Sequence, residues 1–198
     1  MKIKYPSGQK PEITNIQNSS RINKNNEIYI SNANRGMSFE YDINQTNDYY
    51  RENNLAIIYK RATPVKVIKF NSKTSHIVDG VFERISTTDY NGIYKGYYLD
   101  FEAKSTLLTS SFPLSNILDQ QLEHLKSVIF HGGIAFFLIQ FERLNEVYLL
   151  RAKDVLDFIE KNERKSLPLS FIRKNGFLVP IKYFPRIDYL SILDTYIL

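Results

Sequence analysis

One segment limits the possible folds of this chain more than any other. Residues 134–139, Ile-Ala-Phe-Phe-Leu-Ile, are apolar at every position, whereas a strand with one face in water alternates apolar and polar residues. A continuous apolar run that follows Gly132-Gly133 is typical of a strand covered on both faces. We therefore expect a central mixed sheet with helices on its faces, which places the chain in the α/β or α+β class.

The other predicted elements supply such a sheet. Helices are predicted where apolar residues recur at helical spacing, and strands where short apolar or alternating runs lie between turn residues. Helices are expected at 37–53, 115–130, 152–162 and around 189–193, strands at 55–59, 97–104, 134–139 and 147–150, and a hairpin at 65–83. Residues 86–92 are rich in turn formers and are expected to form a turn, and the glycines at 92, 96, 132 and 133 are likewise expected in turns.

Charge is unevenly distributed along the chain, whose net charge is +5. Residues 1–36 hold six Lys and Arg against two acids, residues 37–59 one against four, and residues 60–104 eight against five. The polar residues 1–33 are expected to form a flexible basic arm, and residues 34–198 a folded domain. Two basic segments suit an anionic partner such as nucleic acid, but an ordinary soluble protein with a basic tail has the same pattern.

Several classes of protein are excluded or disfavoured by composition. The chain has no Cys, which excludes a disulfide framework, a thiolate zinc site and a Cys nucleophile, and suits a reducing cytoplasm. No apolar run reaches the roughly 18 residues of a membrane span, and the first residues lack the apolar core of a signal peptide. We therefore expect a cytoplasmic protein that acts away from membranes.

The predicted strand at 97–104 holds the residues most informative about chemistry. Alternation along a strand places Glu102 and Lys104 on one face, together with Asp100. Asp89 precedes Glu102 by thirteen residues with turn formers between them, so a hairpin could return it beside Glu102. Two converging carboxylates repel each other unless a cation lies between them, and Mg²⁺ favours such oxygen ligands. The alternative is an edge strand with an exposed Glu–Lys ion pair.

Three more polar residues could join this site. Thr87 lies two residues before Asp89 and offers an oxygen. Gln121 lies on the helix face that must meet the sheet, although a hydrogen bond to the backbone would also satisfy it. Glu40 lies at the flank of the apolar stripe of the first helix and could be an auxiliary acid, the alternative being a solvated helix carboxylate.

These residues stand in a pattern that closely resembles the RecU-type Holliday-junction resolvases of the PD-(D/E)xK nuclease superfamily, over residues 34–198. The main blocks are Thr87-Thr88-Asp89-Tyr90-Asn91-Gly92, Asp100-Phe101-Glu102-Ala103-Lys104, Ser111-Phe112-Pro113-Leu114 and Gln121-Leu122-Glu123-His124. Shorter matches are Asn34-Arg35-Gly36-Met37, Thr63-Pro64-Val65 and Pro185-Arg186-Ile187-Asp188-Tyr189.

The resemblance implies a restriction-endonuclease-like core and a homodimer. It also implies a Mg²⁺-dependent, structure-selective endonuclease that resolves four-way DNA junctions by paired nicks in homologous recombination, DNA repair and chromosome segregation. The metal, with Mn²⁺ as a substitute, would be held by Thr87, Asp89, Glu102 and Gln121. Lys104 would stabilise the transition state, so the expected catalytic residues are Asp89, Glu102 and Lys104.

Partners follow from the same resemblance. The family modulates the strand-exchange recombinase, and its hairpin, at 65–83 in this chain, is a stalk that enters the centre of the junction. The family usually has Tyr-Pro-x-Arg-Ser in the stalk, whereas this chain has the shorter Asn71-Ser72-Lys73-Thr74-Ser75-His76. The residues expected to contact DNA are Arg35, Lys60, Lys66, Lys69 and Lys73.

Two other functions remain open at this point. One is a duplex endonuclease of the same fold that recognises base sequence. The other is a non-catalytic DNA-binding accessory protein of recombination, against which the intact Asp89, Glu102 and Lys104 argue.

Overall fold

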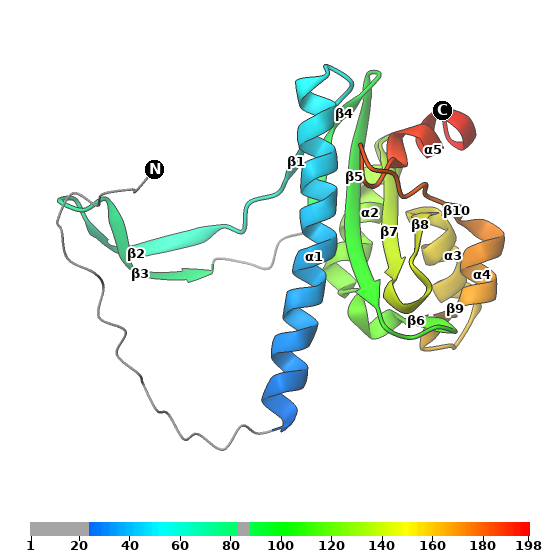
Figure 1. The fold of residues 1–198 in the computed structure, drawn as a ribbon, viewed down its shortest axis with the longest axis horizontal. Helices are drawn as coiled ribbons and strands as arrows, with labels where there is room; N and C mark the ends of the chain where they lie inside the picture. The colour runs from blue at the N-terminus through cyan, green and yellow to red at the C-terminus, as the bar shows by residue number, and fades with distance from the viewer. Residues whose placement is uncertain (1–23, 83–87) are drawn as a thin grey trace, which may run out of the picture.

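The computed structural model describes residues 24–82 and 88–198, with side chains from residue 38 onward in these ranges. Its body is built on a six-stranded mixed sheet in the order β1-β4-β5-β7-β8-β10 (Figure 1). The strands β5 and β7 are parallel, and the other neighbours are antiparallel. The sheet comprises β1 (Ile57–Lys60), β4 (Tyr90–Tyr94), β5 (Tyr97–Thr106), β7 (Ile134–Phe141), β8 (Glu146–Arg151) and β10 (Phe177–Leu178).

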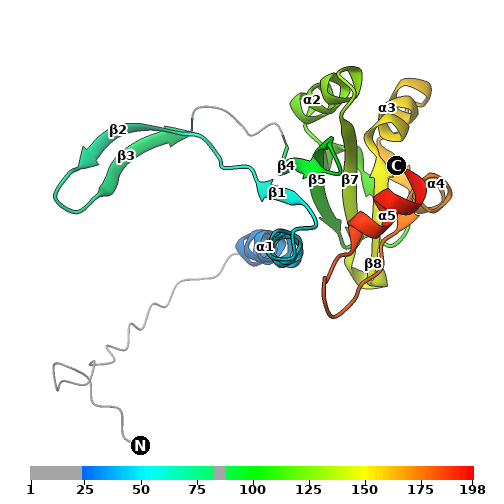
Figure 2. The same cartoon turned by 90° about the horizontal axis from the view of Figure 1, so that it is seen from above.

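Helices cover both faces of this sheet. Figure 2 shows α2 (Asp119–Phe130) and α3 (Ala152–Lys161) on one side, and α1 (Lys24–Glu52) and α5 (Tyr189–Tyr196) on the other. The remaining elements are the helix α4 (Leu169–Asn175), two 3₁₀ turns at Leu114–Asn116 and Glu142–Leu144, and a small sheet of β6 (Ser111–Pro113) with β9 (Ser166–Pro168). The predicted fold class is therefore confirmed. Among the described residues, no helix has both the length and the apolar character needed to span a membrane.

The strand β7 explains why one run of the sequence is apolar throughout. Phe136 and Leu138 point into the core between the sheet and the pair α1 and α5. Phe137 and Ile139 point into the second core, under α2 and α3. All four side chains are fully buried, so every position from Phe136 to Ile139 faces a core.

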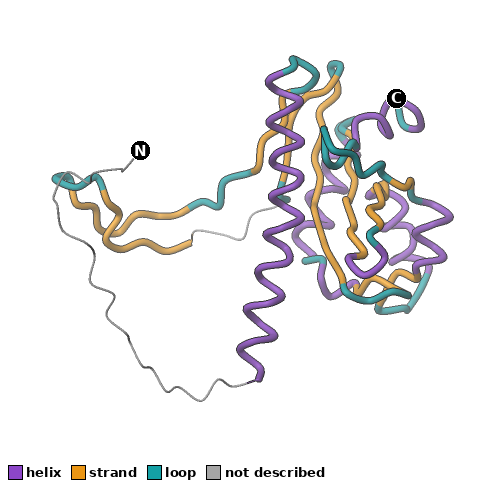
Figure 3. The backbone as a smooth tube through the Cα atoms, in the orientation of Figure 1, coloured by secondary structure: helices purple, strands orange, loops and turns teal. Residues whose placement is uncertain are grey.

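The predicted hairpin is also confirmed, and it stands away from the body. It consists of β2 (Val65–Asn71) and β3 (His76–Phe82), which pair antiparallel with Phe70 opposite Ile77. Every residue of both strands is exposed, and the tube in Figure 3 shows the pair extending away from α1 and the sheet.

The first helix begins earlier than predicted. The periodic apolar residues predicted a helix at 37–53, but α1 starts at Lys24. Residues 24–33, which we expected in the flexible arm, are therefore helical, while residues 1–23 of that arm lie outside the described residues. The early turns were missed because their polar sequence has no apolar stripe from which helical periodicity can be read.

The prediction of a turn at 86–92 is wrong for the part that the structure describes, because Tyr90–Tyr94 form the strand β4 between β1 and β5. Gly92 is likewise a strand residue rather than a turn residue. A Cβ atom at Gly92 would lie 2.1 Å from the carbonyl oxygen of Ile57, so only glycine lets β1 approach this closely. Two turn predictions hold, since Gly96 and Gly132 have φ of +85° and +82°.

Two other boundaries differ from the sequence prediction. The helix expected at 115–130 is divided into the 3₁₀ turn Leu114–Asn116 and α2, and Gln121 caps the start of α2 by accepting a hydrogen bond from the Leu118 N–H at 3.0 Å. The short α4 was not predicted, because its seven residues are too few to show a clear helical period.

Candidate active site

The side chain of Glu102 lies at the centre of a polar cluster between the sheet and α2. It projects from β5, a central strand, and is fully buried, so the alternative of an exposed ion pair on an edge strand is wrong. One carboxylate oxygen accepts hydrogen bonds from Gln121 Nε2 at 2.6 Å and from Lys104 Nζ at 2.5 Å. The other accepts the backbone N–H of Asp89 at 3.0 Å.

Asp89 reaches Glu102 through the hairpin of β4 and β5. This hairpin pairs Tyr90 with Phe101 and so places Asp89 beside Glu102. The Asp89 carboxylate accepts the backbone N–H of Ala103 at 3.1 Å, and the Asp89 carbonyl accepts the N–H of Arg61 at 2.7 Å. The predicted convergence of Asp89, Glu102 and Lys104 is thus present in the structure.

The electrostatics of this cluster are unfavourable for a second negative charge. Burial, together with the charge of Asp89, raises the pKa of Glu102 to about 7, although the Lys104 ammonium acts in the opposite direction. A cation between the two carboxylates would remove this penalty.

The raised pKa predicts how the stability of the metal-free protein depends on pH. Below about pH 4.5 Glu102 is protonated in the folded and unfolded states alike, and it contributes nothing. As the pH rises to about 7 the folded state holds the proton longer, so the free energy of unfolding falls, by up to about 3 kcal/mol. The Tm of Glu102→Gln should therefore exceed that of the wild type by a larger margin at about pH 8 than at about pH 5.

Thermal unfolding in chelator at these two pH values measures the effect. Glu146→Gln serves as the control, because Glu146 is half-buried and its hydrogen bonds to Tyr148 and Arg173 lower its pKa, so this variant should not gain stability as the pH rises. A Tm difference between Glu102→Gln and the wild type that stays constant with pH would contradict the raised pKa.

A second buried carboxylate, which sequence analysis did not identify as a site residue, lies beside the first. Asp100 is on the same face of β5 as Glu102 and is fully buried. One oxygen accepts bonds from Arg61 Nη2 at 2.7 Å, Tyr98 OH at 2.8 Å and His124 Nε2 at 2.9 Å, and the other accepts the Thr88 hydroxyl. The position of Asp100 two residues before Glu102 was the one sequence signal that could have identified it.

The polar atoms of the first cluster suit a divalent cation. Asp89 and Glu102 offer hard oxygen ligands, and their mutual repulsion favours a cation. Gln121 directs its amide nitrogen to Glu102 and its oxygen to Leu118, so in this arrangement it orients Glu102 rather than facing a cation. Asp100 already accepts four donors and is not available as a ligand. The described residues contain no group of three His, Cys, Asp or Glu with metal-site geometry.

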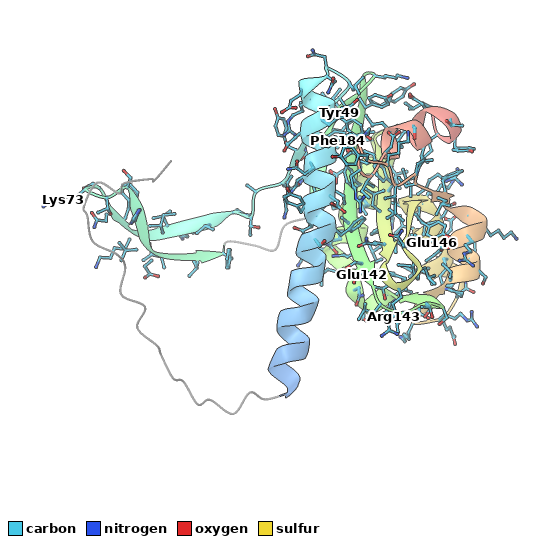
Figure 4. All side chains as sticks on the ribbon, in the orientation of Figure 1. Tyr49, Lys73, Glu142, Arg143, Glu146 and Phe184 are labelled. Carbon is cyan, nitrogen blue, oxygen red and sulfur yellow. The ribbon has the colours of Figure 1, made fainter. Side chains whose placement is uncertain are left out.

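The other predicted site residues are dispersed. Glu40 forms an ion pair with Lys60 on the α1 side of the sheet, and within the described ranges no bond joins either residue to Glu102 or Asp89. Thr87 and the side chain of Arg35 lie outside the described residues. Lys66, Lys69 and Lys73 are exposed on the hairpin, with Lys73 at its far end (Figure 4).

The chain is similar to known proteins over nearly its whole length. The family model of recombination protein U, RecU, matches residues 34–195. The Holliday junction resolvase RecU of Geobacillus kaustophilus is 41% identical over 201 residues, with 98% of each chain covered. The protein of the same name from Streptococcus agalactiae is 44% identical over 181 residues, with 89% of this chain and 91% of the relative covered.

A solved structure is more distantly similar. The Holliday junction resolvase Hjc of Archaeoglobus fulgidus aligns with 72% of this chain and 94% of its own, at 15% identity and a TM-score of 0.41.

Proposed function

The chain belongs to the RecU family, and from this premise we propose that it is a nuclease that cleaves Holliday junctions, with Asp89, Glu102 and Lys104 as its catalytic residues. One observation carries the assignment of residues. The buried Glu102 contacts the backbone of Asp89 and the ammonium of Lys104 at the same point of the sheet. Such a cluster has no value for packing, because burying a carboxylate beside another costs free energy that apolar residues would not.

The proposed mechanism depends on a divalent cation, Mg²⁺ or Mn²⁺. When bound, the cation supplies a Lewis acid for the scissile phosphate and lowers the pKa of a bound water. Asp89 and Glu102 would hold it, with Thr87 as a further ligand, while Gln121 keeps Glu102 directed into the site. The Lys104 side chain is partly exposed, so its ammonium could stabilise charge that develops on the phosphate oxygens.

The biological setting follows from the substrate. A four-way junction has near two-fold symmetry and is resolved by two opposed nicks, so we propose a homodimer with one site in each subunit. Junctions arise from strand exchange, which makes the strand-exchange recombinase a natural partner and the bacterial cytoplasm the natural location.

The test is cleavage of a synthetic four-way junction with each strand labelled in turn. We expect paired nicks in opposed strands with Mg²⁺ or Mn²⁺ and none with chelator. A linear duplex carrying the same sequences is the control, and it should be cut much more slowly. Cleavage of the duplex at an equal rate would instead indicate a duplex endonuclease, and binding without any cleavage would indicate an accessory protein.

The hairpin should supply preference for the junction over the duplex. Its basic tip projects far from the sheet, where it could enter the junction centre (Figure 1). Replacing residues 71–76 with Asn-Gly joins Phe70 to Ile77, which already pair, so the shortened hairpin should keep its register. We expect affinity for the junction to fall about tenfold, the free energy of about one charge-assisted contact, while affinity for the duplex changes little.

A competition titration of junction against duplex measures this preference. Lys73→Ala should reproduce part of the loss, and Lys174→Ala on α4 is the matched control for loss of an exposed lysine. An undiminished preference in the shortened variant would place junction selectivity in the body of the protein.

A further inference from the structure

The Asp100 cluster has features of a binding site that the proposed cleavage mechanism does not use. Asp100 contributes a buried negative charge, and around it are gathered two side chains, Arg61 and His124, that can carry positive charge. Neither is fully covered, since 28% of the Arg61 side chain and 24% of the His124 side chain are exposed. The carboxylate thus fixes the orientation of two groups that remain accessible from outside.

Arg61 is held from two directions. Its backbone N–H donates to the carbonyl of Asp89, and its guanidinium donates to Asp100 through Nη2. The Arg61 Nε is buried and has no hydrogen-bond partner among the described residues. The Nη1 group forms no hydrogen bond among the described residues and is not enclosed as Nε is, so Arg61 retains a donor group for an anionic ligand such as phosphate.

His124 extends the same cluster along α2. It lies one helical turn after Gln121 and donates its Nε2–H to Asp100, while its other ring nitrogen has no partner in the described part of the chain and is a donor for phosphate in the protonated ring. His124 and Tyr98 also line a cavity of about 590 Å³, together with Tyr97, Ser127 and His131. This volume is within the range of small-molecule sites and leaves room for a nucleoside.

The spacing of the two clusters suits a DNA strand. Glu102 and Asp100 are alternate residues of one strand, so their Cα atoms lie about 6.5 Å apart. This separation is comparable to that of neighbouring phosphates in a nucleic-acid chain. A strand whose scissile phosphate lies at a cation held by Asp89 and Glu102 would have a neighbouring phosphate on the side of Asp100, where Arg61 and His124 are bonded.

We propose that Arg61 and His124, oriented by Asp100, bind the DNA phosphate next to the scissile phosphate. The inference rests on the proposed junction cleavage, because it takes the position of the scissile phosphate from that function. Arg61 and His124 are binding residues in this arrangement, and Asp100 is a positioning residue that acts through them.

A double-mutant cycle between protein and substrate tests the proposal. It combines a protein variant with a modified phosphate and asks whether the two losses of affinity are independent or coupled. The nick is first mapped with the wild type in Mg²⁺, and a series of junctions is then prepared, each with one neutral methylphosphonate near the nick. Binding of each junction is measured in chelator, where no cleavage occurs. Arg61→Gln should bind the unmodified junction about 10- to 100-fold more weakly, the loss of a charge-assisted contact.

Coupling should appear at one position only. With the methylphosphonate next to the scissile phosphate, the wild type should lose at least as much affinity as Arg61→Gln loses on the unmodified junction. Arg61→Gln should lose less than the wild type there, because only the His124 contact remains to be removed. His124→Ala should couple to the same phosphate. Arg173→Gln, which breaks the ion pair with Glu146 on β8, is the matched control and should bind every junction as the wild type does.

Two results would overturn the proposal. One is that the loss of affinity from Arg61→Gln and the loss from the methylphosphonate are independent, and so multiply, wherever in the junction the methylphosphonate is placed. The other result is measured with the wild-type protein alone, so it does not depend on whether a variant folds. It is that neutralising the phosphate next to the nick weakens binding no more than neutralising a remote phosphate. If the wild type fails to cut the junction at all, the proposed function fails, whereas cutting without coupling removes this inference alone.

Discussion

Glu102→Gln should cleave four-way junctions about 10³-fold more slowly than the wild type, or worse, in saturating Mg²⁺. Gln has nearly the shape of Glu but no charge, so the variant loses a cation ligand while the packing around β5 is kept. Junction binding should survive or tighten, because a negative charge beside the DNA phosphate has been removed. The variant should also be the more stable protein at neutral pH, since the buried charge that opposes folding is gone.

Single-turnover cleavage and gel-shift binding on the same junction separate these effects. Asp89→Asn should show the same loss of rate with retained binding. Glu146→Gln removes a carboxylate on the side of the body away from the hairpin (Figure 4) and should cleave normally. Wild-type rates in either site variant would show that the carboxylates at 89 and 102 do not hold the cation.

Lys104→Ala should lower the cleavage rate by roughly 10²–10³-fold, the usual loss when one electrostatic donor is removed from a transition state. Affinity for the cation should change little or rise, because a neighbouring positive charge is lost. Lys104 also lowers the pKa of Glu102, so removing it should move the acid limb of the pH–rate profile to higher pH.

The control for Lys104→Ala is Lys182→Ala, which breaks a lysine–carboxylate pair of equal length, 2.5 Å, with Asp188. This variant should cleave at the wild-type rate. A Lys104→Ala enzyme that binds the cation poorly, yet cleaves normally once saturated, would show that Lys104 supports the site structurally.

The first cluster could be predicted because its members lie close together in the sequence. Asp89 and Glu102 are joined by one hairpin, and alternation along a strand places Glu102 and Lys104 on the same face. Gln121 follows on the next helix, whose apolar face must meet the sheet. Local patterns of strand and helix are enough to bring these groups together.

The second cluster could not be predicted in the same way. Arg61 precedes Asp100 by 39 residues, and an entire hairpin lies between them. They meet because β1 lies beside β4, and β4 beside β5, an order that no local pattern reveals. The strand β4 was itself hidden, since Asn91 and Gly92 have turn chemistry and become strand residues only through pairing on both sides.

The attachment of the hairpin has a mechanical consequence. The described chain leaves the body after Arg61 and returns at Thr88, and these two roots are fastened to the carbonyl of Asp89 and the carboxylate of Asp100. The same two hydrogen bonds help to position Asp89 and Asp100, so a force applied at these ends would act on both aspartates. In the proposed function the hairpin binds branched DNA, so strain in that DNA would act through these hydrogen bonds on the site proposed to cut it.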